Sequence, residues 1–163
     1  MPATAKVAVR PAVPEDSALI LKFIRDLAEY EKLLDEAVAT QDDVTVALFG
    51  ENPKAFCDIA EIDGRPVGFA LWFYNFSTFV GRHGIYLEDL FVLPEARGSG
   101  AGKALLANLA RRCLDEKLGR LEWAVLDWNA PSIAFYDSLS AAAMDEWTVR
   151  RMTGEALARL AGR

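Results

Sequence analysis

The stretch Ile85–Lys103, Ile-Tyr-Leu-Glu-Asp-Leu-Phe-Val-Leu-Pro-Glu-Ala-Arg-Gly-Ser-Gly-Ala-Gly-Lys, decides how the rest of the chain is interpreted. It joins a nearly all-apolar strand pattern to a glycine-dense turn, and an amphipathic helix pattern follows. Backbone N–H groups at such a turn and at the start of the helix can face an anion. The stretch therefore predicts a phosphate-binding loop.

Two better-known glycine loops do not fit this stretch. A Walker loop needs glycine where Arg97 stands and Ser or Thr where Ala104 stands. A dinucleotide fingerprint needs its third glycine at the position of Lys103. What remains is Arg97-x-x-Gly100-x-Gly102, an arginine followed by small residues that let a diphosphate approach the backbone closely.

The composition of the 163 residues, 52% hydrophobic and 26% charged, is that of an ordinary folded protein, and the length fits a single domain over residues 1–163. No apolar run reaches the ~18 residues of a membrane span, and the N-terminus lacks a signal-peptide core, so we expect a cytoplasmic protein. The net charge of −6 argues against a nucleic-acid-binding protein. Residues 1–60 carry eleven acidic and six basic side chains, which suits a cationic partner.

Several chemistries are excluded by what the sequence contains. Cys57 and Cys113 are far apart and belong to no CxxC motif, so we expect two apolar fillers and neither a redox pair nor a metal site. The one histidine, His83, lies in a predicted loop, and no Gly-x-Ser-x-Gly motif is present. Serine-hydrolase chemistry is therefore not expected.

The hydrophobic patterns predict an alternation of strands and helices. Asp16 is expected to cap the first helix, Thr40 with Asp43 to form a capping box that starts a short helix ending at Gly50, and Asp63-Gly64 to form a hairpin turn. Strands are predicted over residues 7–10, 55–62, 67–76, 85–93, 121–126 and 144–151; helices after Asp16, over 101–117, from Pro131 and over 153–160; and a loop over 75–84.

Two short segments carry charges that a buried strand or helix does not need. Glu88 and Asp89 interrupt the apolar strand, and neighbouring strand residues point to opposite faces unless a bulge intervenes. Buried charge is costly unless it is paired, so at least one of the two is a candidate for function. At the end of the first helix, carboxylates surround Tyr30 and could form the wall of an amine pocket.

Asn129-x-Pro131-x-x-x-Phe135-Tyr136, combined with the strand 86–92 and the Arg97 loop, resembles the GNAT acetyltransferase superfamily. Within it, the sequence is similar to the diamine and polyamine branch, the spermidine/spermine and thialysine N-acetyltransferases. The resemblance covers nearly the whole chain. It implies a mixed α+β GNAT fold, with a central, mostly antiparallel twisted sheet of 6–7 strands and helices on both faces. It also implies a homodimer, whose sites could be shared across the interface.

The resemblance also implies which residues hold the two substrates, acetyl-coenzyme A and a small cationic amine. Donor contacts fall on the backbone of Leu90, Phe91 and Val92, which would bind the pantetheine arm like another strand. The diphosphate would lie on Arg97, Gly98, Ser99, Gly100, Ala101, Gly102 and Lys103, and further donor contacts would come from Asn129, Ser132 and Tyr136. Acceptor contacts fall on Tyr30, Glu31, Glu88, Asp89, Glu122, Trp123 and Ala124.

In the implied mechanism the amine attacks the thioester directly, without a metal. An amine with a pKa near ~10 is protonated at neutral pH, so it must lose a proton first, and Glu88, directly or through water, is the candidate base. A backbone N–H of residues 90–92 would stabilise the oxyanion, and Tyr136 would protonate the leaving thiolate. Ser140 stands where relatives commonly have glycine, at a turn where a left-handed residue would cost about 1 kcal/mol.

Two other functions fit the same motifs. The chain could acetylate a protein lysine or N-terminus, although an acidic, aromatic pocket favours a small cation. It could also be a non-catalytic acyl-coenzyme A sensor, which would need the loop but neither Glu88 nor Tyr136. The sequence does not identify the amine, the length of the acyl group, or the subunit whose site Tyr30 and Glu31 would line.

Overall fold

The computed structural model describes residues 5–163, which divide into two compact units. The first unit ends at Ala124 and the second begins at Val125. The single domain predicted from the sequence stays a prediction. Within residues 5–163, no helix is both long enough and apolar enough to cross a membrane.

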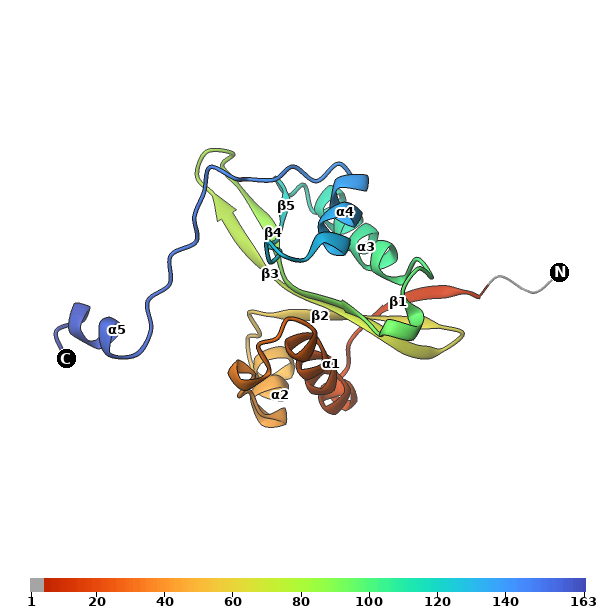
Figure 1. Cartoon of the computed structure of the whole chain (residues 1–163), viewed down its shortest axis with the longest axis horizontal. Helices are drawn as coiled ribbons and strands as arrows, with labels where there is room; N and C mark the ends of the chain where they lie inside the picture. The colour runs from red at the N-terminus through yellow and green to blue at the C-terminus, as the bar shows by residue number, and fades with distance from the viewer. Residues whose placement is uncertain (1–4) are drawn as a thin grey trace. The chain divides into compact units, whose positions relative to one another are not determined.

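A five-stranded sheet forms the first unit, in the order β1-β2-β3-β4-β5 (Figure 1). All neighbouring strands are antiparallel except β4 and β5, which are parallel. The predicted 6–7 strands are therefore one or two too many for the described residues, although the mixed α+β class is confirmed. The strands are β1 (Val7–Pro11), β2 (Phe56–Ile62), β3 (Arg65–Ser77), β4 (Arg82–Val92) and β5 (Leu121–Glu122).

The turn residues explain the position of the β2–β3 hairpin, but the β3–β4 hairpin extends further than its sequence indicates. Asp63 and Gly64 have φ values of 51° and 81°, the left-handed pair that a tight two-residue turn needs. The predicted loop over residues 75–84 is too long, because only residues 78–81 form the turn. β3 continues to Ser77 and β4 starts at Arg82, so His83 lies in a strand. Paired neighbours supply hydrogen bonds across this longer hairpin, which the polar sequence around Ser77 did not indicate.

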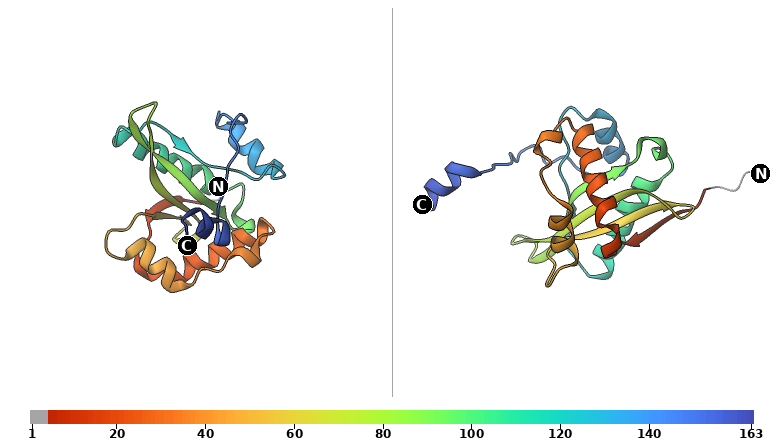
Figure 2. Two further views of the ribbon diagram at one scale, coloured as in Figure 1. Left: turned by 90° about the vertical axis from the view of Figure 1, so that its left-hand side faces the viewer. Right: turned by 90° about the horizontal axis from the view of Figure 1, so that it is seen from below.

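Helices cover both faces of the sheet, which Figures 1 and 2 show as α3 on one side and α1 with α2 on the other. α1 (Ser17–Tyr30) and α2 (Gln41–Phe49) bury Ile20, Phe23, Val44 and Leu48 against Cys57, Ile59, Phe69 and Phe91. α3 (Ala101–Asp115) buries Leu105, Leu106, Leu109 and Cys113 on the opposite face. Three one-turn 3₁₀ helices lie at Pro14–Asp16, Leu34–Glu36 and Pro94–Ala96.

Of the two helix caps predicted from the sequence, the one at α2 is confirmed and the one at α1 is wrong. Thr40 and Asp43 form the predicted capping box, and Gly50 follows α2. Asp16 precedes α1, but its carboxylate binds the guanidinium of Arg10 and the N–H of Val13 and does not cap the helix. The tertiary partner Arg10 is not visible to a local capping rule.

The second unit contains two helices, α4 (Ala130–Ser138) and α5 (Gly154–Leu160). The predicted strand over residues 144–151 is absent, and Met144, Trp147 and Val149 are exposed. Alternating apolar residues favour a strand, but a strand also needs a neighbour to bond with. Two residues after α4, Ser140 has a φ of 62°, and the N–H groups of Ser140 and Ala141 donate to the carbonyls of Asp137 and Tyr136. Ser140 thus adopts the left-handed conformation that costs a non-glycine residue about 1 kcal/mol.

Candidate active site

A β-bulge at Glu88 decides where the two strand carboxylates point. Leu71 pairs with Asp89 and Trp72 with Leu87, so Glu88 is the extra residue of β4. The bulge shifts the alternation of β4, and Asp89 falls on the same face as Phe91, which packs against Phe23 of α1. Glu88 itself is exposed, and Asp89 is partly buried.

Asp89 is the carboxyl group whose acidity is most changed at this site. Burial is the largest of three causes that together raise the pKa of Asp89 to about 7, and the negative charges of Glu88 and Glu31 are the other two. None of the ion pairs among residues 5–163 involves these three side chains. A carboxyl with a pKa near neutrality can exchange protons at physiological pH. The structure thus singles out Asp89, which the sequence placed only among the acceptor contacts.

Tyr30 and Glu31 lie at the C-terminal end of α1, facing this part of β4. Burial raises the pKa of Glu31, and its charge reaches Asp89. The helix ends here because Lys32 adopts a left-handed φ of 62° and the amides of Lys32 and Leu33 return to carbonyls of the last turn. Tyr30, Glu31, Glu88 and Asp89 are therefore brought together from two elements that are far apart in sequence.

The remaining acceptor candidates lie on β5 and just after it. Glu122 is the last residue of β5, and its carboxylate accepts hydrogen bonds from Arg120 (2.7 Å) and the side chain of Asn75 (3.5 Å). Trp123 and Ala124 follow the strand, which is two residues long where six were predicted. Glu122 thus differs from Glu31, Glu88 and Asp89, because it has a cationic partner.

The second half of β4 has an open edge. β5 pairs with Ile85 and Tyr86, and within residues 5–163 no strand pairs with residues 87–92 on that side. The carbonyl of Phe91 faces β3, since a Cβ on Gly68 would lie 2.5 Å from it. Antiparallel alternation then directs the backbone groups of Leu90 and Val92 to the open edge. An extended arm with amide groups could bond there, as the sequence analysis expects for the pantetheine arm.

The loop after β4 has the backbone form that a diphosphate needs. Gly98 and Gly100 have φ values of 79° and 90°, and a Cβ on either would meet no atom within 4 Å. The first bond of the α3 ladder runs from Ala104 N–H to Gly100 O, so the N–H groups of Gly102 and Lys103 have no intrahelical acceptor. These residues fit a bound diphosphate, because the space over the loop is open and amides border it.

Arg97 does not lie over this loop. Its guanidinium carbon is 4.8 Å from the centre of the Tyr30 ring and 5.7 Å from that of Phe91. Its Nε donates to the carbonyl of Val92 at 3.2 Å. The sequence motif indicates a basic residue at this position but not its stacking on Tyr30.

The second unit holds the other predicted donor contacts. Asn129 is buried and its side-chain oxygen accepts from the N–H of Ser132 at 3.4 Å, which caps α4. Pro131 lies in the first turn, where its missing N–H costs nothing. Tyr136 lies on α4, with its ring centre 5.6 Å from that of Phe135.

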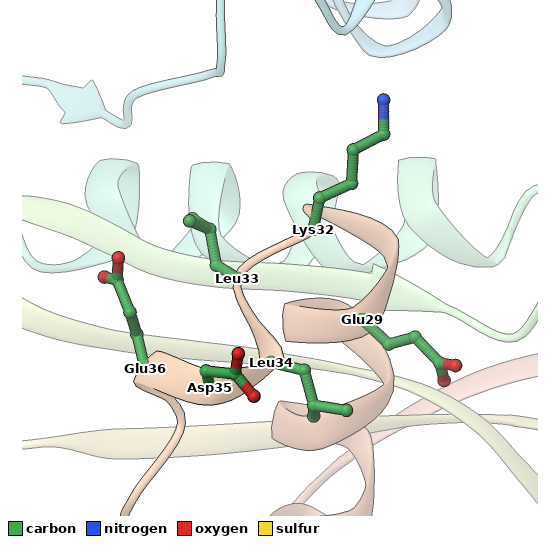
Figure 3. A pocket seen from close by; sticks show the side chains of 6 residues that line it. All are labelled: Glu29, Lys32, Leu33, Leu34, Asp35 and Glu36. Carbon is green, nitrogen blue, oxygen red and sulfur yellow. The ribbon is translucent and has the colours of Figure 1, made fainter.

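An acidic hollow of about 370 Å³ lies beside the end of α1 (Figure 3). In this view Glu29 and Glu36 stand at opposite ends, with Leu33, Leu34 and Asp35 between them. Lys32 completes the lining. The residues that line the hollow flank Tyr30 and Glu31 in the sequence. Its three carboxylates outnumber its one lysine, so a positively charged group could enter it.

Comparisons with known proteins agree with this geometry. Thialysine N-epsilon-acetyltransferase of Sus scrofa is 40% identical, over 98% of this chain and 99% of that protein. L-ornithine N5-acetyltransferase NATA1 of Arabidopsis thaliana is 29% identical, over 91% of this chain and 85% of that protein.

Among solved structures, an integron cassette protein from the mobile metagenome of V. cholerae superimposes with a TM-score of 0.81 and 25% identity. The match covers 96% of this chain and 98% of that one. The sequence profile of the acetyltransferase (GNAT) family matches residues 21–140. The open strand edge, the glycine loop and these matches agree, and the chain belongs to the GNAT family of N-acetyltransferases, which use acetyl-coenzyme A as cosubstrate.

Proposed function

We propose that this acetyltransferase acetylates a primary amine of a small cationic acceptor, a diamine, a polyamine or an amino acid with a second amino group. The observation that carries the proposal is the group of carboxylates Glu31, Glu88 and Asp89, which take part in no ion pair among residues 5–163 and lie where α1 ends with Tyr30. Carboxylates and an aromatic face both attract ammonium groups. The relatives named for thialysine and L-ornithine support an acceptor with two amino groups.

The proposal also covers the donor. Leu90 and Val92 would bind the pantetheine arm through the open edge of β4, with Phe91 between them holding the strand in place. Gly98, Ser99, Gly100, Ala101, Gly102 and Lys103 would hold the diphosphate with backbone N–H groups and the Lys103 charge. Asn129, Ser132 and Tyr136 complete the proposed contacts, and a single catalytic domain over residues 1–163 remains part of the proposal.

Acetyl-coenzyme A supplies the acyl group as a thioester. Glu88 is exposed on the bulge, so its carboxylate can take the proton of the bound ammonium group, directly or through one water, and release it to solvent. Asp89, with a pKa of about 7, supplies negative charge above neutral pH that favours the bound cation and then its proton transfer. Tyr136 would donate its hydroxyl proton to the leaving sulfur. Glu122, Trp123 and Ala124 would border the acceptor.

We also propose that the protein is a homodimer. Trp147, Val149 and Leu160 in the second unit are 73%, 79% and 74% exposed, which is unusual for such large apolar side chains. A second copy would cover them. Light scattering coupled to gel filtration should give twice the mass of the chain, and a monomer at micromolar concentration would contradict this part.

The test of function is release of free coenzyme A thiol from acetyl-coenzyme A. The panel of acceptors comprises thialysine, ornithine, lysine, putrescine, spermidine, spermine and short lysine peptides. We expect turnover with one or more small amines, and a loss of about 10²-fold or more in Tyr136→Phe with donor affinity retained. Turnover only with peptides would contradict the small-acceptor proposal. Unchanged turnover in Tyr136→Phe would remove Tyr136 as the acid.

A further inference from the structure

The side chain of Arg97 contacts residues outside the glycine loop that it begins. It is the first residue of the glycine loop, and its side chain is exposed, yet its guanidinium stacks on Tyr30 at 4.8 Å. A guanidinium over a tyrosine ring makes the same interaction that an ammonium group would make there. Arg97 is thus an internal cation on the aromatic face of the proposed acceptor site.

The same side chain also occupies part of the donor site. Its Nε donates at 3.2 Å to the carbonyl of Val92, one of the two residues whose backbone groups lie at the open edge of β4. One arginine therefore covers a hydrogen-bond acceptor that the donor arm would use and a ring face that the acceptor would use.

A diphosphate on the loop would compete for Arg97. The contacts that hold the guanidinium are a ring face and a neutral carbonyl, and no carboxylate among residues 5–163 is within ion-pair distance of it. Two phosphate oxygens can accept a charge-assisted, bidentate pair of hydrogen bonds from a guanidinium. This contact is stronger than the contact with the ring or with the carbonyl. The amides of Gly102 and Lys103, which would hold that anion, lie at the start of α3, five and six residues after Arg97.

We propose that Arg97 couples the two substrate sites, so that binding of the donor's diphosphate draws Arg97 away from Tyr30 and Val92 and uncovers the acceptor's cation-binding face. The acceptor then binds more tightly to the donor complex than to the free enzyme. This inference rests on the proposed function for the identity of the acceptor, but the movement of Arg97 does not depend on it.

The first experiment follows Tyr30 without any acceptor. The four tyrosines are labelled with 3-fluorotyrosine, and the Tyr30 resonance is assigned with Tyr30→Phe. Inorganic pyrophosphate and desulfo-coenzyme A should each shift the ¹⁹F resonance of Tyr30 in the wild type. In Arg97→Gln the resonance should already be displaced and should not respond. Arg65→Gln, which removes an exposed arginine 3.9 Å from Glu95, is the matched control and should behave as the wild type.

The second experiment measures thialysine binding by calorimetry, with and without desulfo-coenzyme A. The wild type should gain about 2–5-fold in affinity when the analogue is present, the range expected for an exposed cation–π contact. Arg97→Gln should bind thialysine equally in both states, and Tyr30→Leu should bind it weakly in both.

A Tyr30 resonance that ignores both anions, or an unchanged gain in Arg97→Gln, would overturn the coupling while leaving the proposed function intact. Absence of turnover with every small amine, together with an anion-dependent Tyr30 shift, would overturn the acceptor assignment and leave the movement of Arg97 established.

Discussion

Two groups of carboxylates in the first unit have opposite surroundings. Asp16 and Glu61 share Arg10, whose guanidinium lies 2.7 Å from an oxygen of each, and hydrogen bonds from Arg10 lower the pKa of Asp16. No ion pair among residues 5–163 involves Glu31, Glu88 or Asp89, and burial with the charges of the other two raises the pKa of Asp89 to about 7. The first group stabilises the fold, whereas ionisation of the partly buried Asp89 beside two like charges destabilises it.

The largest expected effect is the loss of activity in Glu88→Gln, which removes a carboxylate from the unpaired group. We expect kcat/KM to fall by about 10²–10⁴-fold, the usual contribution of a general base. The thiol-release assay with the best amine of the panel measures it. Glu61→Gln removes a carboxylate from the paired group and should retain full turnover. Equal turnover in both variants would make Glu88 an ordinary surface residue.

The next effect is on stability, in Arg10→Met. Removing the cation leaves the buried carboxylate of Asp16 unpaired, which costs about 3 kcal/mol at pH 7. The folded-state pKa of Asp16 is lowered, so its contribution is present above its ordinary pKa of 3.8 and is lost as pH falls through the folded value.

Urea unfolding at pH 7 and at pH 3 should therefore show a smaller difference between variant and wild type at the lower pH. Arg65→Met, which breaks a long, exposed ion pair, should change stability by less than about 0.5 kcal/mol. A similarly small change in Arg10→Met would show that the paired group contributes little.

Asp89→Asn should have the reverse effect on stability. The folded-state pKa of Asp89 is raised from 3.8 to about 7, so the ionised side chain destabilises the fold above pH 7, and the penalty disappears as pH falls toward 4. The variant should be more stable than the wild type at pH 8, by on the order of 2 kcal/mol, and nearly equal at pH 4. Denaturant titrations across this range measure it. A variant that is less stable at pH 8 would mean that Asp89 is satisfied by its surroundings.

The smallest effect concerns Glu31→Gln. The charge of Glu31 contributes after burial and Glu88 to the raised pKa of Asp89, so its removal should lower that pKa, and by less than the removal of Glu88 would. Carbon NMR of the labelled Asp89 carboxyl, titrated with pH, measures the shift. Glu29→Gln, on the side of the acidic hollow, is the matched control and should leave the titration unchanged. A rise in the pKa of Asp89 in Glu31→Gln would show that the charge of Glu31 does not act on Asp89 in this way.

Sequence patterns predicted most of the elements but not their number or extent. The hairpin at Asp63-Gly64 and the capping box at Thr40 were both found, because each depends on a few adjacent residues. The strand over 144–151 and the long β5 were not, because each needs a neighbouring strand. Asp16 was predicted as a cap and instead binds Arg10, a partner that lies before it in another element.

For the candidate site, the sequence alone determined the glycine loop, the order of motifs and the family. Glycines that adopt positive φ and residues that start helices act through their own backbones. Their positions can therefore be predicted from the local sequence alone. Only the tertiary structure decided that Glu88 forms a bulge, that Asp89 has a pKa near 7, and that Arg97 lies on Tyr30. Strand register, burial and charge each depend on segments that are distant in sequence, and a pattern in one segment does not contain them.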